Sequence, residues 1–304
     1  MGTRRVLACV RQARAVRSLV VTEEVLPVPA QGEVLVQVAC AVVDPEPILA
    51  GCTPDIPEGA FIGTVRTGSD SAHLQPGDWV AGVGPLADFV TVSIGRLQPL
   101  AADAGFARDA MTLLPLLASV VSALGDAGIA QGDRVLISGR GLAARLVEQV
   151  AEIHTGSAPR TLLRGDPPNR REDFDILIDT TADSAWWPRV LPLVREQGRV
   201  LLLLPPGPQV YPLDFYPAIH RRSLRLSARR VPSAGRQLAS TGEGSRFLQR
   251  LLDEGLVRLH GLLADVRVGA QSSSGATIHL DAVAEGHGLV CWFEDGKAGV
   301  DGNR

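Results

Sequence analysis

The first third of the chain alternates apolar and polar residues in short runs that predict β-strands. Residues 17–43 contain two such runs, RSLVVTEEV and EVLVQVACAVV, separated by proline and glycine residues. Three more follow before residue 107: FIGTVRTGS, PGDWVAGV and DFVTVS. Short strands at close spacing are typical of a small barrel or sandwich. We therefore expect a small β-barrel or sandwich domain over residues 1–107.

The pattern changes near residue 108, where longer apolar runs alternate with helical periodicity. Residues 108–127 are predicted to be helical despite Pro115, and so are LAARLVEQVAEIH, WWPRVLPLVREQG and SRFLQRLLDEGLV. DRVLISG, RTLL, FDILIDT, RVLLLLP and SLRLSAR are predicted strands. This alternation is typical of a parallel sheet covered on both faces, so the fold class is α/β over residues 108–255. Short β segments return over residues 256–304, which are expected to complete the first domain.

Composition and charge exclude several classes of function. The chain has 304 residues, 45% of them hydrophobic, and a net charge of −3, which gives no reason to expect nucleic acid or an anionic membrane as a partner. No apolar run is long enough to span a bilayer, and arginines interrupt any signal-peptide core, so the cytoplasm is the expected compartment. Four scattered cysteines fit neither a disulfide framework nor a zinc ribbon.

A glycine motif stands in the first strand–helix unit of the second domain. Gly139, Gly141 and Ala144 form G-x-G-x-x-A between the strand RVLIS and a helix that opens at Leu142. The first glycine permits a tight turn, the second lets the backbone approach a pyrophosphate, and the small third residue lets the helix pack on the strand. The helix N-terminus adds N–H groups and a favourable dipole. The motif predicts a dinucleotide site; an ordinary tight turn between strand and helix is the alternative.

With this motif in place, the chain resembles the medium-chain dehydrogenase/reductases over nearly its whole length. The resemblance is carried by GEVLVQVACAVVDPEPILAG (32–51), FIGTV (61–65), QPGDWVAG (75–82), ADFVTV (87–92), GIAQGDRVLISGRGLAARL (128–146), FDILIDTTAD (174–183) and EQGRVLLL (196–203). It implies a GroES-like β-barrel catalytic domain, a Rossmann domain, and NAD(P)-linked oxidation or reduction in the cleft between them. It also implies a homodimer joined through the edge strand SLRLSAR. Compact bacteriochlorophyllide dehydrogenases look similar, which makes a role in specialised biosynthesis a hypothesis.

The chain departs from the zinc enzymes of that family. Asp44 stands where they place a cysteine ligand, and residues 58–60 (EGA) stand where they have Gly-His-Glu. Residues 83–86 follow Gly82 directly, where their cysteine-rich structural lobe would begin. A lone aspartate without a matched histidine or cysteine is a poor zinc ligand set, so we expect no zinc.

The segment Asp44-Pro45 resembles the Asn-Pro-like segment of zinc-free quinone-oxidoreductase-like relatives. That resemblance places Asp44 at the nicotinamide end of the cleft, as a proton donor or acceptor or as a substrate anchor. A turn aspartate before a proline is an equal alternative. Tyr216 is a second candidate, because its hydroxyl would donate a proton to a developing alkoxide; packing of its ring is the alternative.

The nucleotide-binding half is expected to be shortened. Only residues 167–173 separate RTLLRGD from FDILIDT, which removes the edge strand 3 of a 3-2-1-4-5-6 sheet. Arg164 at the end of the second strand would favour a 2′-phosphate and hence NADP, whereas Asp166 there would favour NAD. The nearby Arg170 and Arg171 favour NADP; an empty, decayed site is the alternative.

Two functions remain open on these grounds. The first is a zinc-independent, NADP-preferring oxidoreductase that transfers hydride to or from a carbonyl, secondary alcohol or activated alkene of an apolar small molecule. Thr180 and Thr181, at the end of the fourth strand, would then lie near the nicotinamide, or they would cap the next helix. The second is a non-redox pseudoenzyme that keeps the scaffold to bind a ligand or a partner protein.

Overall fold

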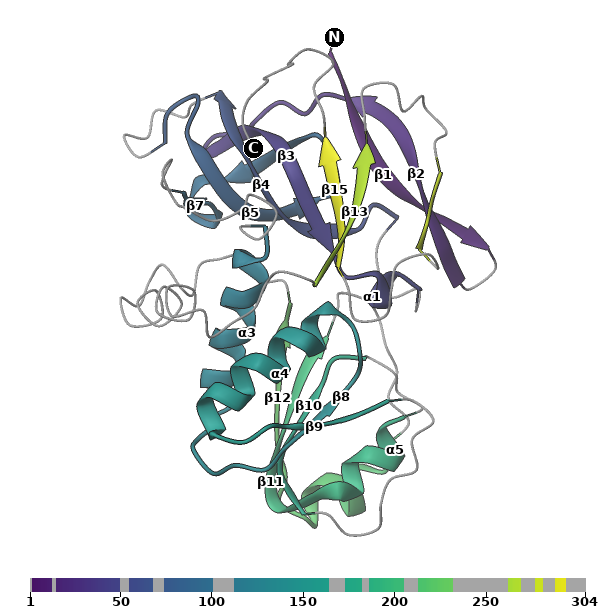
Figure 1. Ribbon diagram of the computed structural model, residues 1–304, viewed down its shortest axis with the longest axis vertical. Coiled ribbons are helices and arrows are strands. Elements are labelled where there is room, and N and C mark those ends of the chain that lie inside the picture. The colour runs from purple at the N-terminus through teal and green to yellow at the C-terminus, as the bar shows by residue number, and fades with distance from the viewer. Residues whose placement is uncertain are drawn as a thin grey trace, which may run out of the picture.

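In the computed structural model, an antiparallel β domain and a parallel α/β domain are stacked along the long axis of the molecule (Figure 1). The structure describes residues 2–12, 15–49, 55–67, 74–100, 112–163, 173–181, 186–204, 213–231, 262–268, 277–280 and 288–293. The predicted α/β fold class, with a GroES-like barrel and a shortened Rossmann sheet, is confirmed. No helix within the described ranges is long and apolar enough to cross a membrane.

The antiparallel domain consists of two sheets that face a common apolar core. Its strands are β1 (Thr3–Gln12), β2 (Ala15–Val25), β3 (Glu33–Val43), β4 (Glu58–Thr67), β5 (Trp79–Pro85), β6 (Phe89–Ser93), β7 (Gln98–Pro99), β13 (Leu263–Val268), β14 (Thr277–His279) and β15 (Gly288–Phe293). One sheet has the order β1-β2-β14; the other has the order β13-β15-β3-β4-β5-β7, with β6 on β3. Because β13 and β15 lie in the second sheet, the C-terminal part of the chain returns to the first domain.

Strand β1 was not expected from the sequence, because arginines interrupt its apolar pattern. In the fold these arginines take part in ion pairs. Arg4 Nη2 lies 2.7 Å from Glu24 Oε2 on β2, and Arg5 Nε lies 2.9 Å from Asp88 Oδ2. A hydrogen bond of 2.9 Å from Leu7 N–H to the Leu86 carbonyl then joins the two sheets into a barrel.

The parallel domain is a five-stranded sheet of order β12-β11-β10-β8-β9. Its strands are β8 (Val135–Ser138), β9 (Arg160–Leu162), β10 (Phe174–Asp179), β11 (Val194–Leu204) and β12 (Arg225–Arg230). One face packs against α3 (Leu114–Asp126) and α4 (Leu142–Thr155), and the other packs against Trp186 and α5 (Trp187–Val190). The central strands β8 and β10 and the second half of β11 are therefore apolar on both faces, as their continuous apolar sequences predicted, whereas the edge strand β12 is largely exposed.

One predicted helix is wrong in its second half. WWPRVLPLVREQG forms α5 and a 3₁₀ turn, η2 (Leu191–Leu193), after which β11 begins at Val194. Pro192 has no N–H for a helical hydrogen bond, and Gln197 adopts a φ of 58° in a bulge of β11. The predicted helix SRFLQRLLDEGLV lies outside the described residues.

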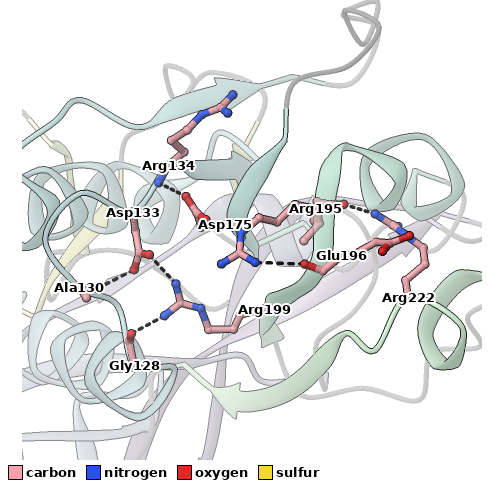
Figure 2. Close-up of polar contacts among 10 residues, drawn as sticks. Gly128, Ala130, Asp133, Arg134, Asp175, Arg195, Glu196, Arg199 and Arg222 are labelled. Carbon is pink, nitrogen blue, oxygen red and sulfur yellow. Dashed lines mark hydrogen bonds and ion pairs between the residues drawn. The ribbon is translucent and has the colours of Figure 1, made fainter.

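Charged side chains tie together the amino ends of the parallel strands (Figure 2). Arg199 Nη2 lies 2.6 Å from Asp133 Oδ1, and its Nη1 donates to the carbonyl of Gly128 after α3. Arg195 Nε lies 2.5 Å from Asp175 Oδ1. Partial burial tends to raise the pKa of Asp175, but the Arg134 N–H and the Arg195 and Arg199 guanidinium groups outweigh it and lower that pKa. This end of the sheet is therefore stabilised by paired charges.

Helix α3 connects the two domains through a shared core. Its buried side chains pack with Val42, Ile62 and Ala81 of the barrel, and also with Ile137 and Ile178 of the parallel sheet. This packing fixes the carboxyl end of β3 above the carboxyl ends of β8 and β10, which is the side of the sheet where ligands bind in open α/β folds.

Candidate functional site

The turn between β8 and α4 is built around Gly139. Its φ is +131°, a conformation that residues with a side chain rarely adopt. A Cβ at this position would lie 2.1 Å from Thr180 Oγ1, so the turn can hold only a glycine without moving its neighbour. Helix α4 begins at Leu142 with Gly141 as its N-cap, which offers no side-chain hydrogen bond to the first turn. Groups from outside the helix must therefore satisfy those N–H groups.

A second turn, at Thr180 and Thr181, packs against the first. Strands β8 and β10 are parallel neighbours with Ser138 beside Asp179, so both strands end at the same level. Thr180 donates from its N–H (2.9 Å) and from Oγ1 (3.1 Å) to the carbonyl of Ser138. The structure thus brings Gly139 and both threonines together at the carboxyl end of the sheet.

Asp179 is the buried centre of this arrangement. Its side chain is inaccessible to solvent; Oδ2 accepts from Trp187 Nε1 at 2.6 Å, and Oδ1 accepts from Thr181 N–H at 3.1 Å and from Thr181 Oγ1 at 2.8 Å. Burial raises the pKa of Asp179, and these hydrogen bonds oppose the rise only in part. The carboxyl group holds the Thr180–Thr181 turn against Gly139 and also fixes the indole of Trp187.

The buried hydroxyl of Ser138 lies next to this centre. It acts to lower the pKa of Asp179, although its Oγ makes no hydrogen bond of regular geometry. Asp179, Ser138 and Trp187 were not among the candidates from the sequence. A signal existed for Asp179, because a carboxylate at the end of the apolar strand FDILID is unusual in a buried position.

The barrel contributes Asp44 to the same place. Asp44 follows β3 directly and precedes the short helix α1 (Pro45–Leu49). Its Oδ2 accepts a hydrogen bond of 3.1 Å from the backbone N–H of Ala143, in the first turn of α4. A carboxylate from one domain therefore lies at the positive end of a helix dipole in the other.

Several further candidates have a defined position. Leu142 and Ala144 are buried in the core that α4 shares with α3 and the sheet, so their role is to seat the helix. Tyr216 lies in η3 (Tyr216–His220), where its ring is 65% exposed and stacks on His220 at 5.5 Å. Because η3 leads into the amino end of β12, the structure does not bring Tyr216 to the glycine turn. Arg164 and Asp166 lie outside the described residues.

The residues around the Gly139 turn fit the phosphates of a dinucleotide and do not fit a metal ion. A glycine turn without a Cβ, followed by the N-terminus of a 14-residue helix, suits the phosphates of a dinucleotide. A metal ion is not matched, because the part of the chain that the structure describes contains no group of three or more His, Cys, Asp or Glu side chains arranged to hold one. No chemistry through zinc is therefore derived from these residues.

Comparisons with known proteins agree with this fold. No protein-family model matches the chain, and neither does any curated protein sequence. Among solved structures, galactitol-1-phosphate dehydrogenase from Escherichia coli has a TM-score of 0.69 at 17% identity, with 95% of this chain and 99% of that chain covered. An alcohol dehydrogenase from E. coli CFT073 complexed with NADH has 0.68 at 14%, covering 96% and 100%. A Sinorhizobium meliloti protein assigned to the zinc-binding dehydrogenases and bound to NADP has 0.67 at 16%, covering 96% and 100%. The chain therefore has the fold of these dehydrogenases.

Proposed function

We propose that the protein is an NAD(P)-linked oxidoreductase that works without zinc. Its reaction is hydride transfer to or from a carbonyl, secondary alcohol or activated alkene of an apolar small molecule. The observation that carries the proposal is the Gly139 turn, which lies at the carboxyl end of the parallel sheet with α4 behind it and the end of β3 above it. Ligands bind at this edge in open α/β sheets, and the NADP- and NADH-bound structures with the same fold support the choice of cofactor.

The chain's own residues would bind and orient the cofactor. The N–H groups at the start of α4 would bind the phosphates, and the Thr180–Thr181 turn would form the wall next to the glycine turn. When bound, a nicotinamide supplies the hydride-transfer chemistry, so the protein needs to supply orientation, exclusion of water and a proton source. Arg164 favours NADP over NAD in this proposal, and the protein is a homodimer joined through β12.

A second candidate function is a pseudoenzyme that binds a ligand or a partner protein on the same scaffold. The observation in its favour is the Asp44 carboxylate, which already accepts a hydrogen bond from the helix terminus that would bind phosphate.

A binding titration tests the first function against the second. The full chain is titrated with NADPH, NADH and their oxidised forms, with calorimetry or quenching of its four tryptophans as the readout. Saturable binding of NADPH in preference to NADH supports the oxidoreductase and the role of Arg164. Tighter binding of NADH keeps the oxidoreductase and transfers that role to Asp166. The absence of binding of every form at millimolar ligand would refute the oxidoreductase.

A further inference from the structure

Asp44 contacts the N-terminus of α4, where the proposed function has the phosphates of a dinucleotide. The residue lies 99 positions before Ala143 in the sequence, and the two are brought together only by the packing of the barrel on the parallel domain. The N-cap residue Gly141 has no side chain to accept from the first turn, and Asp44 Oδ2 takes this part at 3.1 Å. A helix that lacks its own cap is thus capped by a carboxylate from the other domain.

The carboxylate is presented by well-anchored elements and not by a loose surface loop. Val42 and Val43, just before Asp44, are buried in the barrel, and Ile48 of α1, just after it, is inaccessible to solvent. The side chain of Asp44 is itself part-buried. Its approach to α4 is therefore a property of the fold, and only rotation of the side chain would remove it from the helix terminus.

A carboxylate and a diphosphate cannot both use this terminus fully. Each is an anion that gains from the same N–H groups and from the same positive end of the helix dipole. If both were present, their like charges would also repel each other at short distance in a partly dry site. Binding of one therefore weakens binding of the other, which is a thermodynamic coupling between Asp44 and the ligand.

We infer that Asp44 determines the affinity for the dinucleotide by acting as an internal competitor of its diphosphate. This inference rests on the proposed function, because it takes the glycine turn as the dinucleotide site. Asp44 closes the site when no ligand is bound, and the ligand must displace its carboxylate from Ala143. Such a residue differs from the proton donor that the sequence suggested: loss of a proton donor would reduce turnover and leave affinity unchanged, whereas loss of a competitor raises affinity.

The test compares the wild-type protein with Asp44→Asn, which removes the charge and keeps an amide oxygen of similar position. Glu23→Gln is the matched control, because it makes the same change of charge on an exposed residue of the barrel strand β2. Each full-length protein is titrated with NADPH and with NADH by calorimetry. Asp44→Asn is expected to bind about tenfold more tightly, from the strength of a partly buried charge at a helix terminus, and Glu23→Gln within about twofold of wild type.

A second measurement uses no nucleotide. Thermal unfolding of the ligand-free proteins should show a lower Tm for Asp44→Asn than for wild type and Glu23→Gln, because the negative charge at the positive end of the α4 dipole is lost. Hydrogen exchange of the amides in the first turn of α4 should be faster in the same variant. These readouts establish that the contact exists in solution before any ligand is added.

The outcomes distinguish competition by Asp44 from the proposed function. Tighter binding of a dinucleotide by Asp44→Asn than by wild type supports the competition. If wild type binds a dinucleotide and Asp44→Asn binds it equally or more weakly, the competition is overturned while the proposed function stands. A lower Tm with unchanged affinity has the same meaning, since Asp44 then has a structural role only. If neither protein binds any dinucleotide, the proposed function and the competition both fail.

Discussion

Replacement of Gly139 by alanine should destabilise the protein strongly, because the residue meets two separate obstacles. Its φ of +131° is a backbone region that costs a residue with a Cβ about 1–3 kcal/mol. The new Cβ would also lie 2.1 Å from Thr180 Oγ1, and relief of such an overlap in a packed site costs about 1–3 kcal/mol. Because one small shift of the turn would relieve part of both costs, the free energy of unfolding is expected to fall by about 2–4 kcal/mol. That is a large fraction of the stability of an ordinary domain.

The assay is urea unfolding followed by tryptophan fluorescence. Gly125→Ala in α3 is the matched control: no atom lies within 4 Å of its added Cβ and its φ is ordinary, so it should be neutral or stabilise by up to about 1 kcal/mol. Replacement of glycine by alanine should thus lower the free energy of unfolding at position 139 and should not lower it at position 125. A Gly139→Ala protein within about 0.5 kcal/mol of wild type would refute the geometry of the turn.

A double variant separates the two obstacles. Thr180→Ala alone loses the hydrogen bond from Oγ1 to the Ser138 carbonyl, a cost of about 1 kcal/mol. Combined with Gly139→Ala it also removes the atom that the new Cβ would strike, so the double variant should cost less than the sum of the single ones. Strict additivity would contradict the close contact and leave backbone strain as the whole effect.

Three further predictions concern buried or paired titratable groups. Asp175→Asn should reduce stability by about 1 kcal/mol near pH 7. Because the pKa of Asp175 is lowered in the fold, this contribution is present above its ordinary value of 3.8 and is lost as the pH falls through the lowered pKa, so the difference in Tm between the two proteins should shrink as the pH is reduced below 3.8. Burial raises the pKa of Asp179, so the wild-type protein should lose stability relative to Asp179→Asn as the pH rises from 3.8 through that raised pKa. A difference in Tm between the two proteins that does not change with pH would contradict the raised pKa. Burial raises the pKa of the Cys291 thiol to about 12, so iodoacetamide at about pH 8 should label Cys291 only in urea. Peptide mass spectrometry measures the labelling, and labelling of the native protein would show that β15 is accessible to solvent.

The parallel domain could be predicted from sequence because its signals are local. The central strands contain continuous apolar runs, and the glycine motif at Gly139 fixes where the first strand ends and α4 begins. The barrel was recognised with less detail. Strand β1 escaped prediction because Arg4 and Arg5 break its apolar pattern, and only the fold shows that Glu24 and Asp88 pair with them. A pattern of side chains cannot indicate ion pairs between distant strands.

For the candidate site too, the local features could be predicted from the sequence and the long-range contacts could not. The glycine turn and Thr180–Thr181 follow from strand ends, which the sequence locates. The contact between Asp44 and Ala143 does not, because it depends on the packing of α3 against two different sheets. Asp179 was missed for a related reason: its importance comes from the indole of Trp187 and the hydroxyl of Thr181, which reach it only after the chain turns back.

Carboxylates at the two ends of the parallel sheet have different partners. At the amino end, Asp133 and Asp175 face guanidinium groups, so their charge is compensated and contributes to stability. At the carboxyl end, Asp179 is bound by the neutral donors of Trp187 and Thr181, and one contact of Asp44 is with the peptide N–H of Ala143. Neutral donors stabilise a carboxylate less than a paired cation does. In the competition inferred above, a phosphate would gain the helix terminus only when Asp44 releases the N–H of Ala143.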